Sequence, residues 1–198
     1  MAWVIVGLGN PGNEYENTRH NAGRMAVTHF ANKNELREWK EDRKNELTVA
    51  KGAVGTDTFV LLLPDTYMNK SGSAVLKFIK NPKAAEKMVV VYDDLDLPLG
   101  KIKISFDRGS GGHKGLDSVM RAVKTRKFAR IRIGVSPETA SGKLKKPQGE
   151  KEVNDFILAK FKPAEMEELK KLFKRTSEAV AAIVDRGAVV AMNEFNQN

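Results

Sequence analysis

Apolar and polar positions along the chain form two kinds of pattern, which predict strands and helices in turn. Short apolar runs rich in β-branched residues are typical of buried strands, whereas apolar residues at helical spacing are typical of helices. The expected strands cover residues 3–8, 46–53, 57–63, 88–92, 101–106 and 129–135. The expected helices cover residues 19–33, 70–80, 115–125, 163–186 and 188–194. This order predicts an α/β fold: one domain over residues 1–198, with a twisted, mixed, mostly parallel sheet flanked by helices.

Polar side chains gather directly after three of the expected apolar strands, at residues 10–20, 65–72 and 93–96. A glycine-rich loop at residues 109–115 follows a fourth strand. The carboxyl ends of parallel strands lie at one edge of an α/β sheet and form its sites. We therefore expect these four segments to converge on a single site.

The first cluster begins with a glycine pattern found in dinucleotide-binding proteins, G-x-G-x-x-G, at Gly7, Gly9 and Gly12. In those proteins the third glycine opens a helix whose N-terminus binds the pyrophosphate. Here Pro11 precedes Gly12, and no apolar helical pattern follows directly. Residues 28–38 also do not resemble the second strand that should end in an acidic residue. A dinucleotide-binding enzyme is therefore the less favoured alternative.

The composition, with 41% hydrophobic and 30% charged residues, is typical of a soluble globular protein. No apolar run approaches the roughly 18 residues that span a membrane. The N-terminal residues lack the basic region of a signal peptide. The chain has no cysteine, which excludes disulfides and thiol chemistry. These features predict a cytoplasmic protein that does not bind a membrane.

Positive charge is concentrated in one segment of the chain. The net charge is +9, yet residues 101–151 hold 14 basic and four acidic residues, so this quarter of the chain carries the whole excess. Such a cluster is typical of proteins that bind a polyanion, and a nucleic-acid backbone is favoured over a merely solubilising surface. Within it, residues 136–151 are rich in Pro, Gly and Lys and are expected to form a mobile basic flap.

The polar clusters offer an imidazole, a carboxylate and several amides for chemistry. His20 beside Asp93 would form a general base oriented by an acid. Asn10 and Asn69 would donate hydrogen bonds to a carbonyl oxygen as it gains charge. The three acids at 93–96 could bind Mg²⁺ or Ca²⁺, but leucines interrupt them, so we expect one acid to serve the site and no metal. The combination suits hydrolysis of an ester by activated water, without a cofactor.

Four motifs resemble those of bacterial-type peptidyl-tRNA hydrolase, in the order and at the spacings of that family. They are V-G-L-G-N-P-G-x-x-Y-x-x-T-R-H-N-x-G (6–23), Y-M-N-x-S-G (67–72), D-D-L-D-L-P-x-G (93–100) and G-G-H-x-G (111–115). With R-I-R-I-G at 130–134, the resemblance covers most of the chain. It implies the fold of that family and hydrolysis of the ester between peptide and tRNA in peptidyl-tRNA, which recycles tRNA from stalled translation. It also implies a monomer with no cofactor and no protein partner.

The resemblance further implies roles for single residues. By motif position, His20 is the catalytic base, Asp93 is its partner, and Asn10 distinguishes blocked from free aminoacyl groups. Contacts with the substrate or the tRNA are implied at Tyr15, Tyr67, Asn69, Lys103 and Arg132.

Lys114 stands where the family usually has an asparagine that is thought to hold the substrate and the attacking water. Lysine offers three donors and no acceptor, so it could bind a phosphate or an oxyanion but could not accept a proton from water. Relatives with this fold include non-catalytic RNA-binding proteins, which is the alternative function. That alternative is disfavoured because the candidate base, acid and amides are all present.

Overall fold

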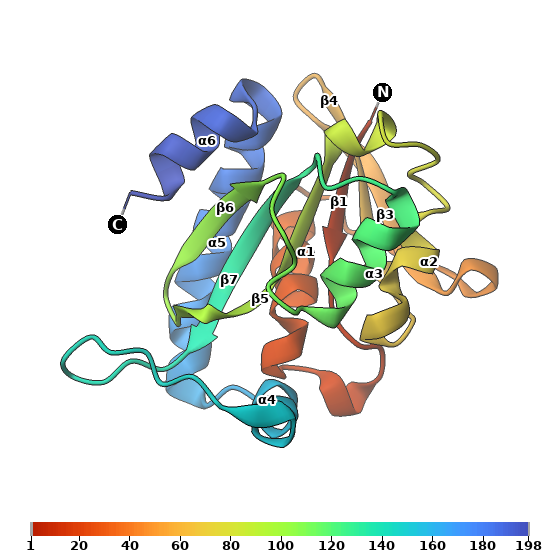
Figure 1. Ribbon diagram of the computed structural model, residues 1–198. Coiled ribbons are helices and arrows are strands. Elements are labelled where there is room, and N and C mark those ends of the chain that lie inside the picture. Colours follow the sequence, from red (N-terminus) through yellow and green to blue (C-terminus); the bar gives the residue numbers. More distant parts are fainter. Residues whose placement is uncertain (1, 198) are drawn as a thin grey trace.

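A seven-stranded β-sheet forms the centre of the computed structural model, which describes residues 2–197 (Figure 1). The strand order is β2-β3-β4-β1-β5-β7-β6. The strands are β1 (Trp3–Gly7), β2 (Lys40–Asp42), β3 (Leu47–Val54), β4 (Asp57–Pro64), β5 (Met88–Pro98), β6 (Ile102–Phe106) and β7 (Ala129–Ser136). The central strands β4, β1, β5 and β7 are parallel to one another, whereas β2, β3 and β6 join through antiparallel pairings. The predicted α/β fold with a mixed sheet is confirmed.

Helices cover both faces of this sheet (Figure 1). They are α1 (Ala22–Lys33), α2 (Ser71–Val75), α3 (Lys114–Val123), α4 (Gly149–Leu158), α5 (Pro163–Arg186) and α6 (Ala188–Phe195). One core joins α1, α5 and α6 to the sheet and includes Ile5 and Val91. The opposite core joins α2 and α3 to the sheet and includes Val6 and Val90. Neighbouring residues of the central strands thus point into different cores, which explains why these strands are continuously apolar.

The longest helix, α5, matches the predicted segment 163–186. Pro163 occupies its first turn, where a missing backbone N–H costs no hydrogen bond. Its buried side includes Leu169, Phe173 and Val180, while lysines and glutamates occupy its exposed positions. Among residues 2–197, no helix has the combination of length and apolar character that a bilayer crossing requires.

A close approach of α1 to the sheet depends on Gly23. A Cβ atom at this position would lie 2.2 Å from the carbonyl oxygen of Val91 in β5 and 2.9 Å from that of Leu8. Only glycine therefore lets the first turn of α1 lie directly against the ends of β1 and β5. This packing brings His20, three residues before Gly23, to the carboxyl edge of the sheet.

The prediction of a flap over residues 136–151 is wrong at its C-terminal end, because helix α4 begins at Gly149. The segment before it is a loop that contains an isolated bridge between Glu138 and Leu144. Glu150 and Glu152 lie in the first turn of α4, where carboxylates favour helix formation. The Glu152 carboxylate also accepts a hydrogen bond from the backbone N–H of Gln148, at 3.1 Å.

Two other boundaries differ from the prediction. Of the helix expected at residues 70–80, only α2 (Ser71–Val75) is a regular α-helix. Tighter turns follow it, in which the N–H of Phe78 donates to the carbonyl of Val75. The strand expected at residues 88–92 continues as β5 to Pro98, with a register shift against β7 after Asp94. The extension carries the acidic cluster, so its side chains project from a strand rather than a loop.

Candidate active site

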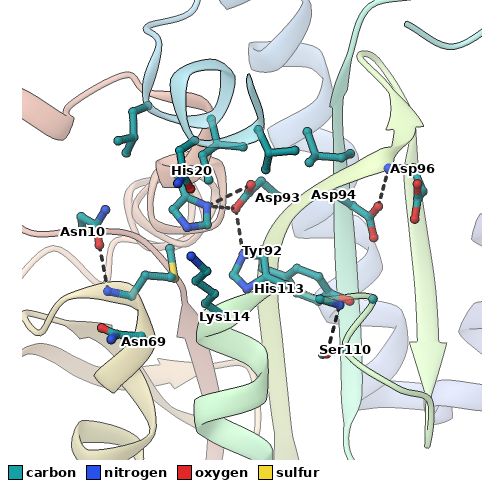
Figure 2. Close-up of a pocket in the computed structure, with 18 of the residues that line it drawn as sticks. Asn10, His20, Asn69, Tyr92, Asp93, Asp94, Asp96, Ser110, His113 and Lys114 are labelled. Carbon is teal, nitrogen blue, oxygen red and sulfur yellow. Dashed lines mark hydrogen bonds and ion pairs between the residues drawn. The ribbon is translucent and has the colours of Figure 1, made fainter. Parts of the chain in front are cut away.

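A cavity of about 660 Å³ opens at the carboxyl ends of β1 and β5, beside the start of α3 and one side of α4. Its lining consists of Asn10, His20, Lys146 and residues from the segments 67–70, 92–96, 110–114 and 153–158. The three polar clusters and the glycine-rich loop therefore meet around one cavity, as predicted (Figure 2). The segment 153–158 adds an apolar wall that sequence patterns did not assign to the site.

His20 and Asp93 form a buried pair at the base of this cavity (Figure 2). The His20 Nδ1 atom lies 3.0 Å from Oδ1 and 3.1 Å from Oδ2 of Asp93. Because the carboxylate can only accept, Nδ1 carries the proton of the neutral ring and Nε2 keeps its lone pair. His20 can therefore take a proton from a group in the cavity through Nε2.

The backbone that carries His20 is anchored by its neighbour Arg19. The Arg19 guanidinium binds both carboxylate oxygens of Glu165, at 2.8 and 2.9 Å. It also donates to the carbonyls of Ala159 and Lys160, at 3.2 and 3.1 Å. These bonds tie the short 3₁₀ turn Arg19–Asn21 to the ends of α4 and α5. The turn that carries the imidazole is consequently held against the segment between α4 and α5.

A second histidine, His113, binds the same carboxylate. Its Nε2 atom lies 3.0 Å from Oδ1 of Asp93, and its Nδ1 atom accepts the backbone N–H of Leu116, at 3.1 Å. The proton of this ring must therefore sit on Nε2, which makes its tautomer the opposite of that of His20. The rings of the two histidines are 5.0 Å apart. Asp93 thus accepts hydrogen bonds from two imidazoles at once.

The surroundings of Asp93 keep its carboxylate ionised. Burial acts to raise the pKa of Asp93, but the positive charge of His20 and His113 when they are protonated, together with their hydrogen bonds, outweighs burial and holds the pKa well below its usual range. The three ligand atoms are close enough together to hold a metal ion. However, Nε2 of His113 serves as a donor, because Leu116 already occupies the lone pair of Nδ1. This hydrogen bonding favours a carboxylate between two N–H donors over a metal site.

Asn10 presents a fixed amide to the cavity. Its Oδ1 atom accepts the backbone N–H of Met68, at 2.9 Å. The Asn21 side chain holds the Asn10 backbone in place, accepting its N–H at 2.8 Å and donating to its carbonyl at 3.0 Å. Because Oδ1 is engaged, the group that Asn10 can offer to a ligand is the Nδ2 donor.

Comparison with known proteins identifies the family. The family model of peptidyl-tRNA hydrolase matches residues 4–198. The chain belongs to the peptidyl-tRNA hydrolase family. The peptidyl-tRNA hydrolase of Carboxydothermus hydrogenoformans is 39% identical over 98% of either chain, and that of Herpetosiphon aurantiacus is 38% identical over 98% of this chain and 90% of its own. The crystal structure of peptidyl-tRNA hydrolase from Acinetobacter baumannii matches with a TM-score of 0.85 and 32% identity, covering 99% of this chain and 95% of that one.

Three of the predicted contact residues line the cavity: Tyr67, Asn69 and Lys114. All three are exposed, and Tyr67 retains 64% of its accessible surface. The Nζ atom of Lys114 lies 3.3 Å from a carboxylate oxygen of Glu150 in α4. The departure from the family pattern therefore places a cation at the rim, where it already faces a carboxylate.

The other predicted contacts lie outside the cavity. Lys103 and Arg132 are direct cross-strand partners on β6 and β7. The Arg132 side chain is half-buried and its Nε atom donates to Asp94, at 2.6 Å. Tyr15 ends the 3₁₀ turn Asn13–Tyr15 and is not among the described residues that line the cavity.

Sequence reasoning placed His113 and Asn21 near the site but did not predict the contacts that they make. A histidine between a glycine-rich loop and an apolar helical pattern is a candidate helix cap, and His113 does accept the Leu116 N–H in that position. Its bond to Asp93 depends on the path of the loop, which no periodic pattern encodes. All three acids at 93–96 line the cavity, but Asp93 alone pairs with the two histidines, whereas Asp94 and Asp96 pair with Arg132 and Lys146.

We predict that the two histidines hold opposite tautomers in solution. Long-range ¹H–¹⁵N spectra at about pH 8, where imidazoles are mostly neutral, should show His20 protonated on Nδ1 and His113 on Nε2. Asp93→Asn should shift both signals. His29 should not change, because it packs against Phe173 outside the cluster. A His113 ring protonated on Nδ1 would contradict the hydrogen bonding described here.

Proposed function

We propose that this chain hydrolyses the ester bond between peptide and tRNA in peptidyl-tRNA, using a water molecule that His20 activates. The observation that carries the proposal is the orientation of His20, whose Nδ1 is bound to Asp93 and whose Nε2 is left for the cavity. Membership in the peptidyl-tRNA hydrolase family supports the same reaction. The product tRNA returns to translation.

The chemistry follows from the arrangement of three side chains. Nε2 of His20 takes a proton as the water oxygen bonds to the ester carbon. The ionised Asp93 stabilises the imidazolium that forms, and Nδ2 of Asn10 donates to the carbonyl oxygen as it becomes negative. The ester C–O bond then breaks, and the imidazolium returns its proton to the ribose oxygen that leaves. No step requires a metal or a cofactor.

The tRNA body would lie along the basic segment beside the cavity. Lys103 and Arg132 form a pair of cations on β6 and β7, and the loop after β7 adds further lysines. A nearby phosphate backbone would extend from these strands to the cavity and place the esterified 3′ end at His20. Non-catalytic RNA binding is not favoured, because it would not require a buried base oriented by a carboxylate. Within the same proposal the protein acts as a cytoplasmic monomer, without a protein partner, and Tyr15, Tyr67 and Asn69 contact the substrate.

We predict that His20→Ala abolishes turnover of N-blocked aminoacyl-tRNA while leaving tRNA affinity intact, because the base acts mainly in the transition state. Asp93→Asn should lower kcat by about 10²-fold. Loss of the negative charge destabilises the imidazolium, so His20 becomes protonated only at lower pH and the acidic limb of the pH–rate profile moves to lower pH. A profile and a rate identical to those of the unaltered protein would exclude Asp93 as the partner of His20.

The proposed path of the tRNA makes a second prediction. Affinity for tRNA should fall linearly with the logarithm of salt concentration, and Lys103→Ala should reduce the slope by about one unit. Replacing Arg132 as well should reduce it further and raise KM more than it lowers kcat. Lys174→Ala, an exposed lysine on α5, is the matched control and should leave the slope unchanged. Equal slopes for all variants would mean that Lys103 and Arg132, on β6 and β7, do not contact the tRNA backbone.

Lys114 provides a third test, because its partner is known. Lys114 and Glu150 are 61% and 80% exposed, and such ion pairs stabilise a protein by at most about 1 kcal/mol. A tRNA phosphate can therefore displace Glu150 from Lys114. Lys114→Asn should raise KM with little change in kcat, whereas Glu150→Gln should lower KM. If both variants change KM in the same direction, the pair has a structural role and Lys114 does not bind the substrate.

A further inference from the structure

Arg130 in β7 is fully buried, with no exposed surface. Its Nη1 atom donates to the carbonyl of Gly109, at 2.9 Å. Its Nη2 atom contacts the sulfur of Met120 and the carbonyl of Arg126, each at 3.4 Å. The guanidinium carbon lies 4.9 Å from the centre of the Phe128 ring. This arrangement places a cation in the apolar core behind the cavity.

A charge in this position is costly to maintain. Burial lowers the pKa of Arg130, because the interior disfavours the charged form. No carboxylate of residues 2–197 forms an ion pair with this guanidinium, although Asp107 acts on it from a distance. The Nε atom also has no hydrogen-bond partner among the described residues. An apolar side chain of similar volume would fill the space at lower cost, so the hydrogen bonds of Arg130 require another explanation.

The groups that Arg130 contacts lead to His113 by two routes. Gly109 opens the glycine-rich loop that ends at His113. Tyr92, on the neighbouring strand β5, lies close enough to Arg130 to act on the pKa of the guanidinium, and its ring meets the His113 ring edge to face, with centroids 4.9 Å apart. Burial raises the pKa of Tyr92 to about 12, so the hydroxyl stays neutral and can accept from the guanidinium. Tyr92 and His113 lie side by side in Figure 2.

We propose that Arg130 is a positioning residue for the hydrolysis, which acts by holding the Gly109 carbonyl and the Tyr92 hydroxyl so that His113 stays bound to Asp93. The inference rests on the proposed function and deepens it. Because His113 shares the carboxylate with His20, its position determines how strongly Asp93 supports the imidazolium of His20. A guanidinium suits this role since its planar fork holds donors on separate nitrogens in fixed directions, whereas a lysine has all three donors on one nitrogen.

Arg130 and Arg132 occupy alternate positions of one strand but differ in role. Arg132 is half-buried, pairs with Asp94 and lies beside the exposed Lys103. Arg130 is covered by the loop and by α3, so an RNA phosphate has no access to it. An effect of Arg130 on catalysis must therefore be transmitted by the residues that it contacts.

The experiment measures Arg130→Lys, which keeps the charge and removes the fork. We expect kcat to fall about tenfold, because a carboxylate that keeps only one of its two donors no longer fixes the His20 ring in one orientation, while KM for N-blocked aminoacyl-tRNA stays unchanged. Once His113 no longer donates to Asp93, the carboxylate supports the His20 imidazolium more strongly, and the acidic limb of the pH–rate profile moves to higher pH. The Nε2–H signal of His113 should broaden or disappear in the free protein.

A second variant and a control complete the test. Tyr92→Phe removes the hydroxyl but keeps the ring. It should therefore change the acidic limb of the pH–rate profile and the His113 signal in the same way as Arg130→Lys does. The effects of Tyr92→Phe and Arg130→Lys should not add in the double variant, because both act on one network. Leu172→Ala, which creates a cavity in the opposite core, should lower Tm and leave kcat, the limb and the signal unchanged.

Each outcome decides for or against the inference. Arg130→Lys could lower Tm while kcat, the acidic limb of the pH–rate profile and the His113 signal stay as in the unaltered protein. That outcome would mean that Arg130 only stabilises the core. If Arg130→Lys does not fold, an unchanged His113 signal in Tyr92→Phe overturns the inference. If the unaltered protein does not cleave the ester at all, the proposed function fails, while the His113 signal still tests whether Arg130 positions this ring.

Discussion

The buried carboxylate of Asp93 is the group on which the rest of the site depends. A charge at the end of a central strand is tolerated only because two imidazole N–H groups neutralise it through hydrogen bonds. Each imidazole in turn needs support: His20 from the turn that Arg19 anchors to α5, and His113 from the glycine-rich loop and α3. The close packing of α1 on the sheet supports the position of the His20 ring, and the buried Arg130 of β7 supports that of the His113 ring. Both rings are thereby held at the carboxylate of Asp93.

Most of the fold could be predicted because its central strands are continuously apolar and end in recognisable polar clusters. The convergence of Asn10, His20 and Asp93 followed from a general property of parallel sheets, whose strand ends share one edge. The roles of His113 and Arg130 could not be predicted, since both depend on the path of an irregular loop. The start of α4 was missed for a different reason: Pro, Gly and Lys residues gave the segment the composition of a loop, and the carboxylates that favour the helix are few. Tyr15 stays a prediction, because it lies apart from the cavity.

Three basic side chains around the cavity are already paired with carboxylates of the protein itself. The pairs are Arg132 with Asp94, Lys146 with Asp96 and Lys114 with Glu150. A nucleic acid that binds here would exchange carboxylates for phosphates at these three positions. Each exchange of a carboxylate for a phosphate contributes little binding free energy by itself. Only a polyanion that replaces several carboxylates at once would therefore bind tightly. This arrangement discriminates against small anions and favours a ligand with a phosphate backbone.

The anchoring of Arg19 also limits when the site can form during synthesis of the chain. Its partners at Ala159 and Glu165 follow it by 140 and 146 residues, and contacts across such separations form late in folding. On the ribosome, the anchor of Arg19 therefore cannot form before Glu165 has been synthesised. A shorter, unfinished copy of the chain therefore lacks the bonds that hold the turn carrying His20 against the ends of α4 and α5.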